Sequence, residues 1–236
     1  MPTFQCRVHG NEVSLSNAPA RVVCFVALSG GRVARRVAAA RLWPDLGPAR
    51  AAKMLRQNLW KIRHLSTGRL LHVTPHEVAL REDVEVDFFR AERLARSVLN
   101  ERVRLGEITA DGPHGWPEFT RELLAGHSAE EVADARARWD RLRLLALEKI
   151  AAEALEAGDL LSAIQVADSI TLIDGLNEAA HRTLVAAYQA RRDPRTASAI
   201  YRGYATVLRR ELGVAPGFAL SPVDAPEQRR RGLRQG

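Results

Sequence analysis

The sequence is poor in cysteine and has no long apolar run, which argues against a secreted, disulfide-stabilised or membrane protein. Cys6 and Cys24 stand alone in apolar surroundings, outside any Cys-x-x-Cys pair. We interpret them as small hydrophobic residues of a reducing cytoplasm, with a disulfide between them as the lesser alternative. The longest uncharged segment runs only from Leu212 to Val223 and is interrupted by prolines. Because the N-terminus has no apolar signal segment either, a cytoplasmic protein is expected.

Motifs for catalysis and cofactor binding are also lacking. The sequence contains no Gly-x-x-x-x-Gly-Lys-Ser/Thr phosphate loop, no Gly-x-Ser-x-Gly elbow and no dinucleotide-binding glycine fingerprint. His72 and His76 are four positions apart, but Pro75 and an expected hairpin disfavour a metal pair at that spacing. His181 falls within an expected helix, where we interpret it as packed or solvated. The sequence therefore predicts no enzyme, no cofactor and no metal site.

One long segment, between Asp45 and Glu77, contains no carboxylate. A helix is expected within it from Pro48 to Leu65, and at 3.6 residues per turn its side chains fall on two faces. The anchoring face holds Ala51, Leu55, Asn58, Leu59 and Ile62. The other face holds Arg50, Lys53, Arg56, Gln57, Trp60, Lys61, Arg63 and His64. Such a helix suits a DNA major groove, because cations meet phosphates while Gln and Arg side chains meet base edges.

The positive charge is concentrated in the first third of the chain. Residues 1–86 hold 13 Lys and Arg against 6 Asp and Glu, whereas residues 87–236 hold 22 of each. Coding bias toward arginine, or an ordinary solvated face, is the alternative explanation, but bias would spread the excess evenly. An excess of positive charge confined to one part of the chain is typical of a nucleic-acid-binding surface. The change near residue 86 also favours two domains, 1–86 and 87–220, followed by a disordered tail, 221–236.

The first domain is predicted to be a winged helix. The expected elements are strands at 4–8 and 12–15, helices from Pro19 to Leu28, Val33 to Trp43 and Pro48 to Leu65, and a hairpin of 70–73 and 78–80. Gly68 ends the third helix, and Val84, Val86 and Phe88 alternate as an extended segment after the hairpin. Helix, turn, helix and hairpin in this order are typical of a winged helix.

The second domain repeats along the sequence with a period of about 34 residues, the length of a tetratricopeptide repeat. A shift by this period superposes Ile150 on Leu184, Ala152 on Ala186, Ala154 on Tyr188, Asp159 on Asp193, Ala163 on Ala197 and Ala167 on Tyr201. The period predicts an all-α tetratricopeptide-like domain, unless two Ala-rich helix pairs superpose by chance. A capping box at 128–131 predicts a long helix that ends at Gly158, and Asp193 and Pro194 predict another that ends at Gly213.

Several spaced motifs together resemble one known family. They are Leu42–Asp45, Ala49–Ala52, Leu55–Arg63, Val86–Asp87, Leu172–Asp174 and Leu176–His181. Over most of its length the chain resembles the SARP-type (Streptomyces antibiotic regulatory protein) regulators, which join an OmpR-like winged helix to a bacterial transcriptional activation domain. Gly175 departs from the pattern, since the repeat usually has proline there. The resemblance implies that helix 48–65 is the recognition helix, residues 74–77 are the wing and residues 43–47 touch RNA polymerase.

The site residues follow from the helix pattern and the resemblance together. We expect contacts with promoter DNA from Arg50, Lys53, Arg56, Gln57, Asn58, Trp60, Lys61, Arg63, His64, Thr74 and His76. Contacts with RNA polymerase are expected from Trp43, Pro44, Asp45 and Leu46. Trp60 has two equal interpretations. The wing covers its ring, or the ring contacts a DNA sugar or a thymine methyl group.

The sequence therefore predicts a mostly α protein with a small β component that activates transcription. The resemblance implies binding to promoter direct repeats, recruitment of the RNA polymerase holoenzyme, a second protomer side by side on the DNA, and genes of a secondary-metabolite pathway. A tetratricopeptide-type adaptor with non-specific nucleic-acid binding and a transcriptional repressor are the alternatives. An enzyme is a more distant one.

Overall fold

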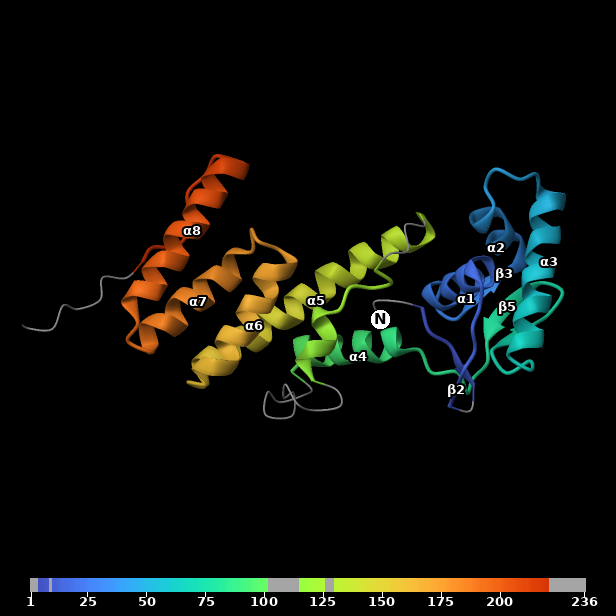
Figure 1. Ribbon diagram of the computed structural model, residues 1–236, viewed down its shortest axis with the longest axis horizontal. Helices are drawn as coiled ribbons and strands as arrows, with labels where there is room; N and C mark the ends of the chain where they lie inside the picture. Colours follow the sequence, from blue (N-terminus) through green and yellow to red (C-terminus); the bar gives the residue numbers. More distant parts are fainter. Residues whose placement is uncertain (1–3, 9, 102–114, 126–129, 221–236) are drawn as a thin grey trace, which may run out of the picture. The chain divides into compact units, whose positions relative to one another are not determined.

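The computed structural model describes residues 4–8, 10–101, 115–125 and 130–220. These residues are mostly helical and include two small antiparallel sheets (Figure 1). Their contacts divide the chain into two compact units, one of residues 1–97 and 117–143 and the other of residues 98–116 and 144–236. In the described part of the chain, no helix is long and apolar enough to cross a membrane.

The first unit contains a short hairpin, a cluster of three helices and a three-stranded sheet. Its helices are α1 (Asn17–Leu28), α2 (Arg35–Leu42), α3 (Pro48–Leu65), most of α4 (Asp87–Leu99), most of the short 3-10 helix η2 (Trp116–Thr120) and the first half of α5 (Glu130–Glu156). Its strands are β1 (Arg7–Val8), β2 (Asn11–Glu12), β3 (Arg32–Ala34), β4 (Leu71–Val73) and β5 (Glu77–Leu80). β1 pairs with β2, and β5 lies between β3 and β4 with both pairings antiparallel.

One apolar core joins the three helices and the sheet. α1 contacts both α2 and α3, and Figure 1 shows the three helices gathered around β3 and β5. The most deeply buried side chains of this core are Val22, Val26, Ala38, Leu42, Ala51, Leu55, Ile62 and Val78. They come from α1, α2, α3 and β5, so the core determines which face of α3 is turned away from the rest of the unit.

Most predicted elements of the first unit are present. α3 has the predicted bounds, Pro48–Leu65, and the β4–β5 hairpin forms around residues 74–76. α1 begins at Asn17, slightly before Pro19, which was expected to open it.

Three predictions differ from the structure. The strands expected at 4–8 and 12–15 are reduced to Arg7–Val8 and Asn11–Glu12. The second helix was expected to begin at Val33, but residues 32–34 form β3, because Gly30 and Gly31 (φ 83° and 81°) turn the chain so that it pairs with β5. Phe88 was expected in an extended alternation. It lies in α4, where its N–H donates to Asp87 Oδ1 at 2.8 Å.

The second unit contains the end of α5 (Glu130–Glu156) followed by α6 (Leu160–Ile173), α7 (Glu178–Ala190) and α8 (Pro194–Leu212). α7 contacts both α6 and α8. The predicted end of a long helix before Gly158 and the predicted helix from Pro194 to Leu212 are confirmed. Ser128 of the expected capping box and the tail 221–236 lie outside the described residues.

The geometry of the second unit repeats with the same period as its sequence. The chain leaves α5 and α7 through Gly158 and Arg192, both with positive φ (77° and 59°). It enters α6 and α8 through Asp159 and Asp193. Each carboxylate accepts the backbone N–H of the residue three positions later, at 3.2 and 3.1 Å respectively. Hydrogen bonds from the side chains of Ser162 and Thr196, and then from their backbone N–H groups, lower the pKa of the Asp159 and Asp193 carboxyl groups. The period in the sequence therefore corresponds to a period in the backbone.

Candidate nucleic-acid interface

The ends of α3 are fixed by local chemistry. Pro48 occupies the first turn, where its missing N–H removes no helical hydrogen bond. At the other end the N–H of Gly68, which has φ 72°, donates to the carbonyl oxygen of Arg63 at 2.8 Å. Arg63 and His64 lie in the last turn, where positive charge is favourable to the helix dipole. The cationic segment is therefore a complete helix of 18 residues.

The two faces of α3 are separated as the pattern predicts. Ala51, Leu55, Leu59 and Ile62 are buried in the core. On the opposite side the following residues are exposed: Arg50, Lys53, Arg56, Gln57, Trp60, Lys61, Arg63 and His64. Within the described ranges, none of the cations on this face is ion-paired with a carboxylate. We call these eight residues the outer face of α3.

Asn58 does not belong to the outer face. Its side chain is 3% exposed, and its Nδ2 donates to the carbonyl oxygen of Met54 at 2.8 Å, one turn earlier in the same helix. An amide held in this way cannot reach a base edge, so the expectation that Asn58 contacts DNA is wrong. The internal hydrogen bond explains how a polar residue is accommodated on the anchoring face.

Trp60 and His64 form a flat pair on the outer face. Their rings are stacked with centroids 5.5 Å apart and planes 7° from parallel. Trp60 is 66% exposed, so the alternative in which the hairpin covers it is wrong. A single exposed Trp needs no explanation, but a stacked pair in the middle of a cationic face offers an apolar surface beside cations.

The tip of the β4–β5 hairpin is held by its own hydrogen bonds. Thr74 Oγ1 accepts the N–H of His76 at 3.3 Å and that of Glu77 at 3.1 Å, and the Thr74 carbonyl accepts from Arg35 Nη1 at 3.0 Å. The N–H of Arg35 in turn donates to the His76 carbonyl at 2.8 Å. Thr74 is therefore engaged in shaping the turn, while the His76 side chain is exposed.

The turn between α2 and α3 is partly core. Trp43 and Leu46 are half-buried and pack against the hydrophobic core, and the Leu46 N–H donates to the Trp43 carbonyl at 3.2 Å. Pro44 and Asp45 are exposed. Of the four residues expected to meet a partner, two therefore hold the turn in place and two are open to solvent.

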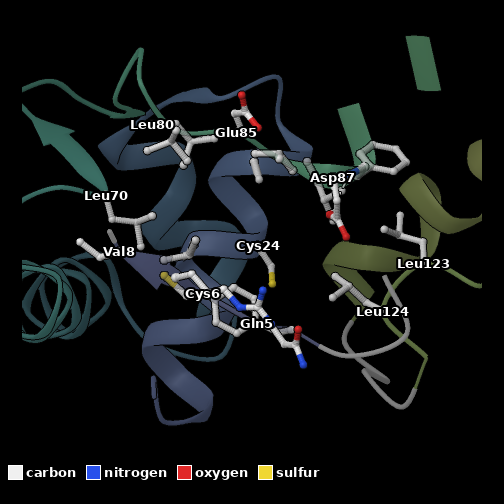
Figure 2. A pocket seen from close by; sticks show the side chains of 18 of the residues that line it. Gln5, Cys6, Val8, Cys24, Leu70, Leu80, Glu85, Asp87, Leu123 and Leu124 are labelled. Atoms are coloured by element: carbon white, nitrogen blue, oxygen red, sulfur yellow. Dashed lines mark hydrogen bonds between the residues drawn. The ribbon is translucent and has the colours of Figure 1, made fainter. Parts of the chain in front are cut away.

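A partly open cavity of about 870 Å³ is a separate feature of the first unit. Figure 2 shows Cys6 and Cys24 among its lining side chains, together with Leu123 and Leu124. Both thiols are free, so the disulfide alternative is wrong. Burial raises the pKa of Cys6, and it raises the pKa of Cys24 to about 12. Both thiols are protonated near neutral pH and are weak nucleophiles.

In the portion of the chain that the structure describes, no three His, Cys, Asp or Glu side chains gather so that they could hold a metal ion. His72 lies on β4 and His76 at the hairpin tip, with Pro75 between them.

Arg35 is a residue that the sequence reasoning missed. It links the start of α2 to the hairpin tip through both its side chain and its backbone N–H. The sequence contains no local signal for this role, because Arg35 and Thr74 are 39 positions apart and Arg35 is one of many arginines.

Comparison with known families gives a match that covers more than half of the chain. The model of the bacterial transcriptional activator domain matches residues 86–225, which include α4 to α8. A comparison with curated proteins gives no match. α3 and the β4–β5 hairpin precede the matched segment, so what they bind is inferred from their own geometry.

Proposed function

Because the chain belongs to the bacterial transcriptional activator domain family, we propose that it is a transcriptional activator that binds promoter DNA sequence-specifically. Residues 1–86 form a winged helix in this proposal, with α3 as recognition helix and the β4–β5 hairpin as wing. Residues 87–220 form the activator domain, built from tetratricopeptide-like repeats. The observation that carries the proposal is the outer face of α3, which presents cations, an amide and stacked rings but no carboxylate.

The outer face supports DNA binding because its chemistry matches the two parts of a duplex. Arg and Lys neutralise phosphates and release counterions, while Gln57 and Lys61, nearest the centre of the face, are candidates for base edges. The Trp60–His64 pair offers apolar contact to a sugar or a thymine methyl group. His76 contacts the DNA backbone from the wing, and Arg35 and Thr74 hold the wing in position.

Activation is assigned to the exposed part of the turn between α2 and α3. Asp45 is an acidic residue directly before the long segment without a carboxylate. Negative charge there is unfavourable against DNA and favourable against a basic patch on the RNA polymerase holoenzyme. This observation favours an activator over the two alternatives, a repressor and a tetratricopeptide-type adaptor that binds nucleic acid non-specifically.

The arrangement on DNA and the target genes follow from the resemblance to SARP-type regulators. Two protomers bind direct repeats side by side, and the genes belong to a secondary-metabolite pathway. Protomers on direct repeats face the same way, so their contact joins two unlike surfaces. A unit of stacked helices can supply two such surfaces.

The outer face of α3 should make both phosphate and base contacts. Alanine at Lys53, Arg56, Lys61 or Arg63, where it removes a phosphate contact, should weaken binding to all DNA sequences alike. It should also reduce the slope of log affinity against log salt concentration by about one. Where it removes a base contact, it should cost about 1–3 kcal/mol on the cognate site alone. Affinities on promoter and random duplexes over a salt series distinguish the two classes. Lys149→Ala, in the second unit, is the control. Unchanged operator affinity with Gln57 and these four residues all replaced by alanine would contradict the assignment.

Asp45→Asn should separate activation from DNA binding. Loss of an exposed charge contact worth up to about 1 kcal/mol should lower transcription roughly two- to fivefold in a purified polymerase assay. Promoter affinity should stay the same, because Asp45 does not contact DNA in the proposal. Glu82→Gln, another exposed acidic residue of the first unit, is the matched control and should change neither quantity. A parallel loss of DNA affinity and transcription would argue against a polymerase contact.

Cooperative binding should depend on the orientation of the half-sites. Two synthetic operators with identical half-sites at the same centre-to-centre distance, one direct and one with a half-site inverted, are compared in gel-shift titrations. Stronger cooperativity is expected on the direct repeat, because the DNA raises the effective concentration of two correctly oriented surfaces. Stronger cooperativity on the inverted pair would indicate a two-fold symmetric dimer instead.

A further inference from the structure

The segment after α8 is attached to the two last helices through a pair of neighbouring residues. α8 ends at Gly213 (φ 71°), and the chain then runs back beside the helix in Figure 1. We call residues 214–220 the strap. The strap has no regular secondary structure, and most of its residues are exposed. Its polar and aromatic contacts come from Gly217 and Phe218.

Gly217 is held by a carboxylate that an arginine orients. Its N–H donates to Glu178 Oε2 at 2.8 Å, and Glu178 Oε1 accepts from Arg182 Nη2 at 2.9 Å, one turn onward in α7. A Cβ atom at position 217 would come within 2.7 Å of Glu178 Oε1. A side chain at this position would push the Glu178 carboxylate away from its present place, so the observed hydrogen bond favours glycine.

Phe218 fits among rings from α7 and α8. It meets Tyr201 edge to face, with centroids 5.4 Å apart, and lies over Tyr204 at 6.2 Å with planes 21° from parallel. The guanidinium carbon of Arg182 is 5.5 Å from the Phe218 centroid, a cation–π distance. Tyr204 also stacks on the ring of His181, with the two centroids 4.1 Å apart. One arginine thus serves both the carboxylate and the aromatic ring.

α7 and α8 contact each other, and each buries apolar side chains of its own. α7 buries Leu184 and Val185, and α8 buries Ala197 and Leu208, whereas Phe218 remains half-exposed. The strap therefore resembles a peptide bound across two helices, since two consecutive residues make its polar and aromatic contacts.

We propose that Glu178, Arg182, Tyr201 and Tyr204 form a recognition site for an extended peptide with glycine followed by an aromatic residue, and that Gly217–Phe218 occupies it as an internal ligand. The carboxylate selects a backbone N–H, the close approach selects glycine, and the rings with Arg182 select an aromatic side chain. Because the strap is tethered, its effective concentration is in the millimolar range, and a free peptide must compete with it. This inference concerns the second unit and does not depend on DNA binding.

The site is tested by releasing the strap in the full chain and offering the same segment as a free peptide. A fluorescent peptide of residues 213–220 should bind the Phe218→Ala chain about tenfold more tightly than the unchanged chain, as measured by fluorescence polarisation. A peptide with alanine in place of its phenylalanine should not bind either chain. Ala215→Ser, an exposed strap position, is the matched control and should behave like the unchanged chain.

Two further variants distinguish peptide recognition from a non-specific destabilisation of the second unit. Gly217→Pro should also release the strap, because proline lacks the N–H that donates to Glu178, and it should raise peptide binding as Phe218→Ala does. Adding Glu178→Gln to the Phe218→Ala chain should weaken peptide binding again, while circular dichroism shows unchanged helix content. Equal peptide binding to released and unreleased chains, or none to either, would overturn the proposal.

Discussion

The outer face of α3 depends on the burial of the opposite face. Ala51, Leu55, Leu59 and Ile62 are packed with residues of α1, α2 and the sheet in one apolar core. Each residue of a helix is rotated by a fixed angle from the one before it. Burying this stripe therefore fixes the direction of all the remaining side chains of α3. Hydrophobic packing, the main favourable term in folding, thus holds the cations and the stacked rings toward solvent. Neutralising a few exposed cations should leave this packing intact, whereas replacing the buried stripe would alter stability first.

The bounds of α3 could be predicted because independent local signals agree. Pro48 favours a helix start, the apolar residues repeat with helical period, and Gly68 supplies the positive φ that ends the helical turn. The same agreement explains the helix from Pro194 to Leu212, which Gly213 caps. Such signals lie within a few positions of the boundary they define, so one sequence suffices to read them.

The remaining differences come from partners distant in the sequence. β3 is very short and is a strand only because β5 pairs with it, which no local pattern in Arg32–Ala34 indicates. Asn58 was expected to contact DNA, yet its position on the buried stripe decided the outcome. Phe218 lies in a segment with no periodicity, and its site is assembled from α7 and α8.

Lysine reactivity tests the central claim most directly, because the chain has three lysines, Lys53 and Lys61 on α3 and Lys149 on α5. Lys149 binds Glu101 and Glu153 at 3.1 and 3.0 Å, and each lysine is compared with itself. The full chain is acetylated at near-physiological salt, with and without the promoter segment that it protects in a footprinting experiment. Mass spectrometry then measures the extent of acetylation at each lysine. We predict that DNA slows acetylation of Lys53 and Lys61 and leaves Lys149 unchanged. Protection of Lys149 alone, or of no lysine in a saturated complex, would contradict DNA binding through α3.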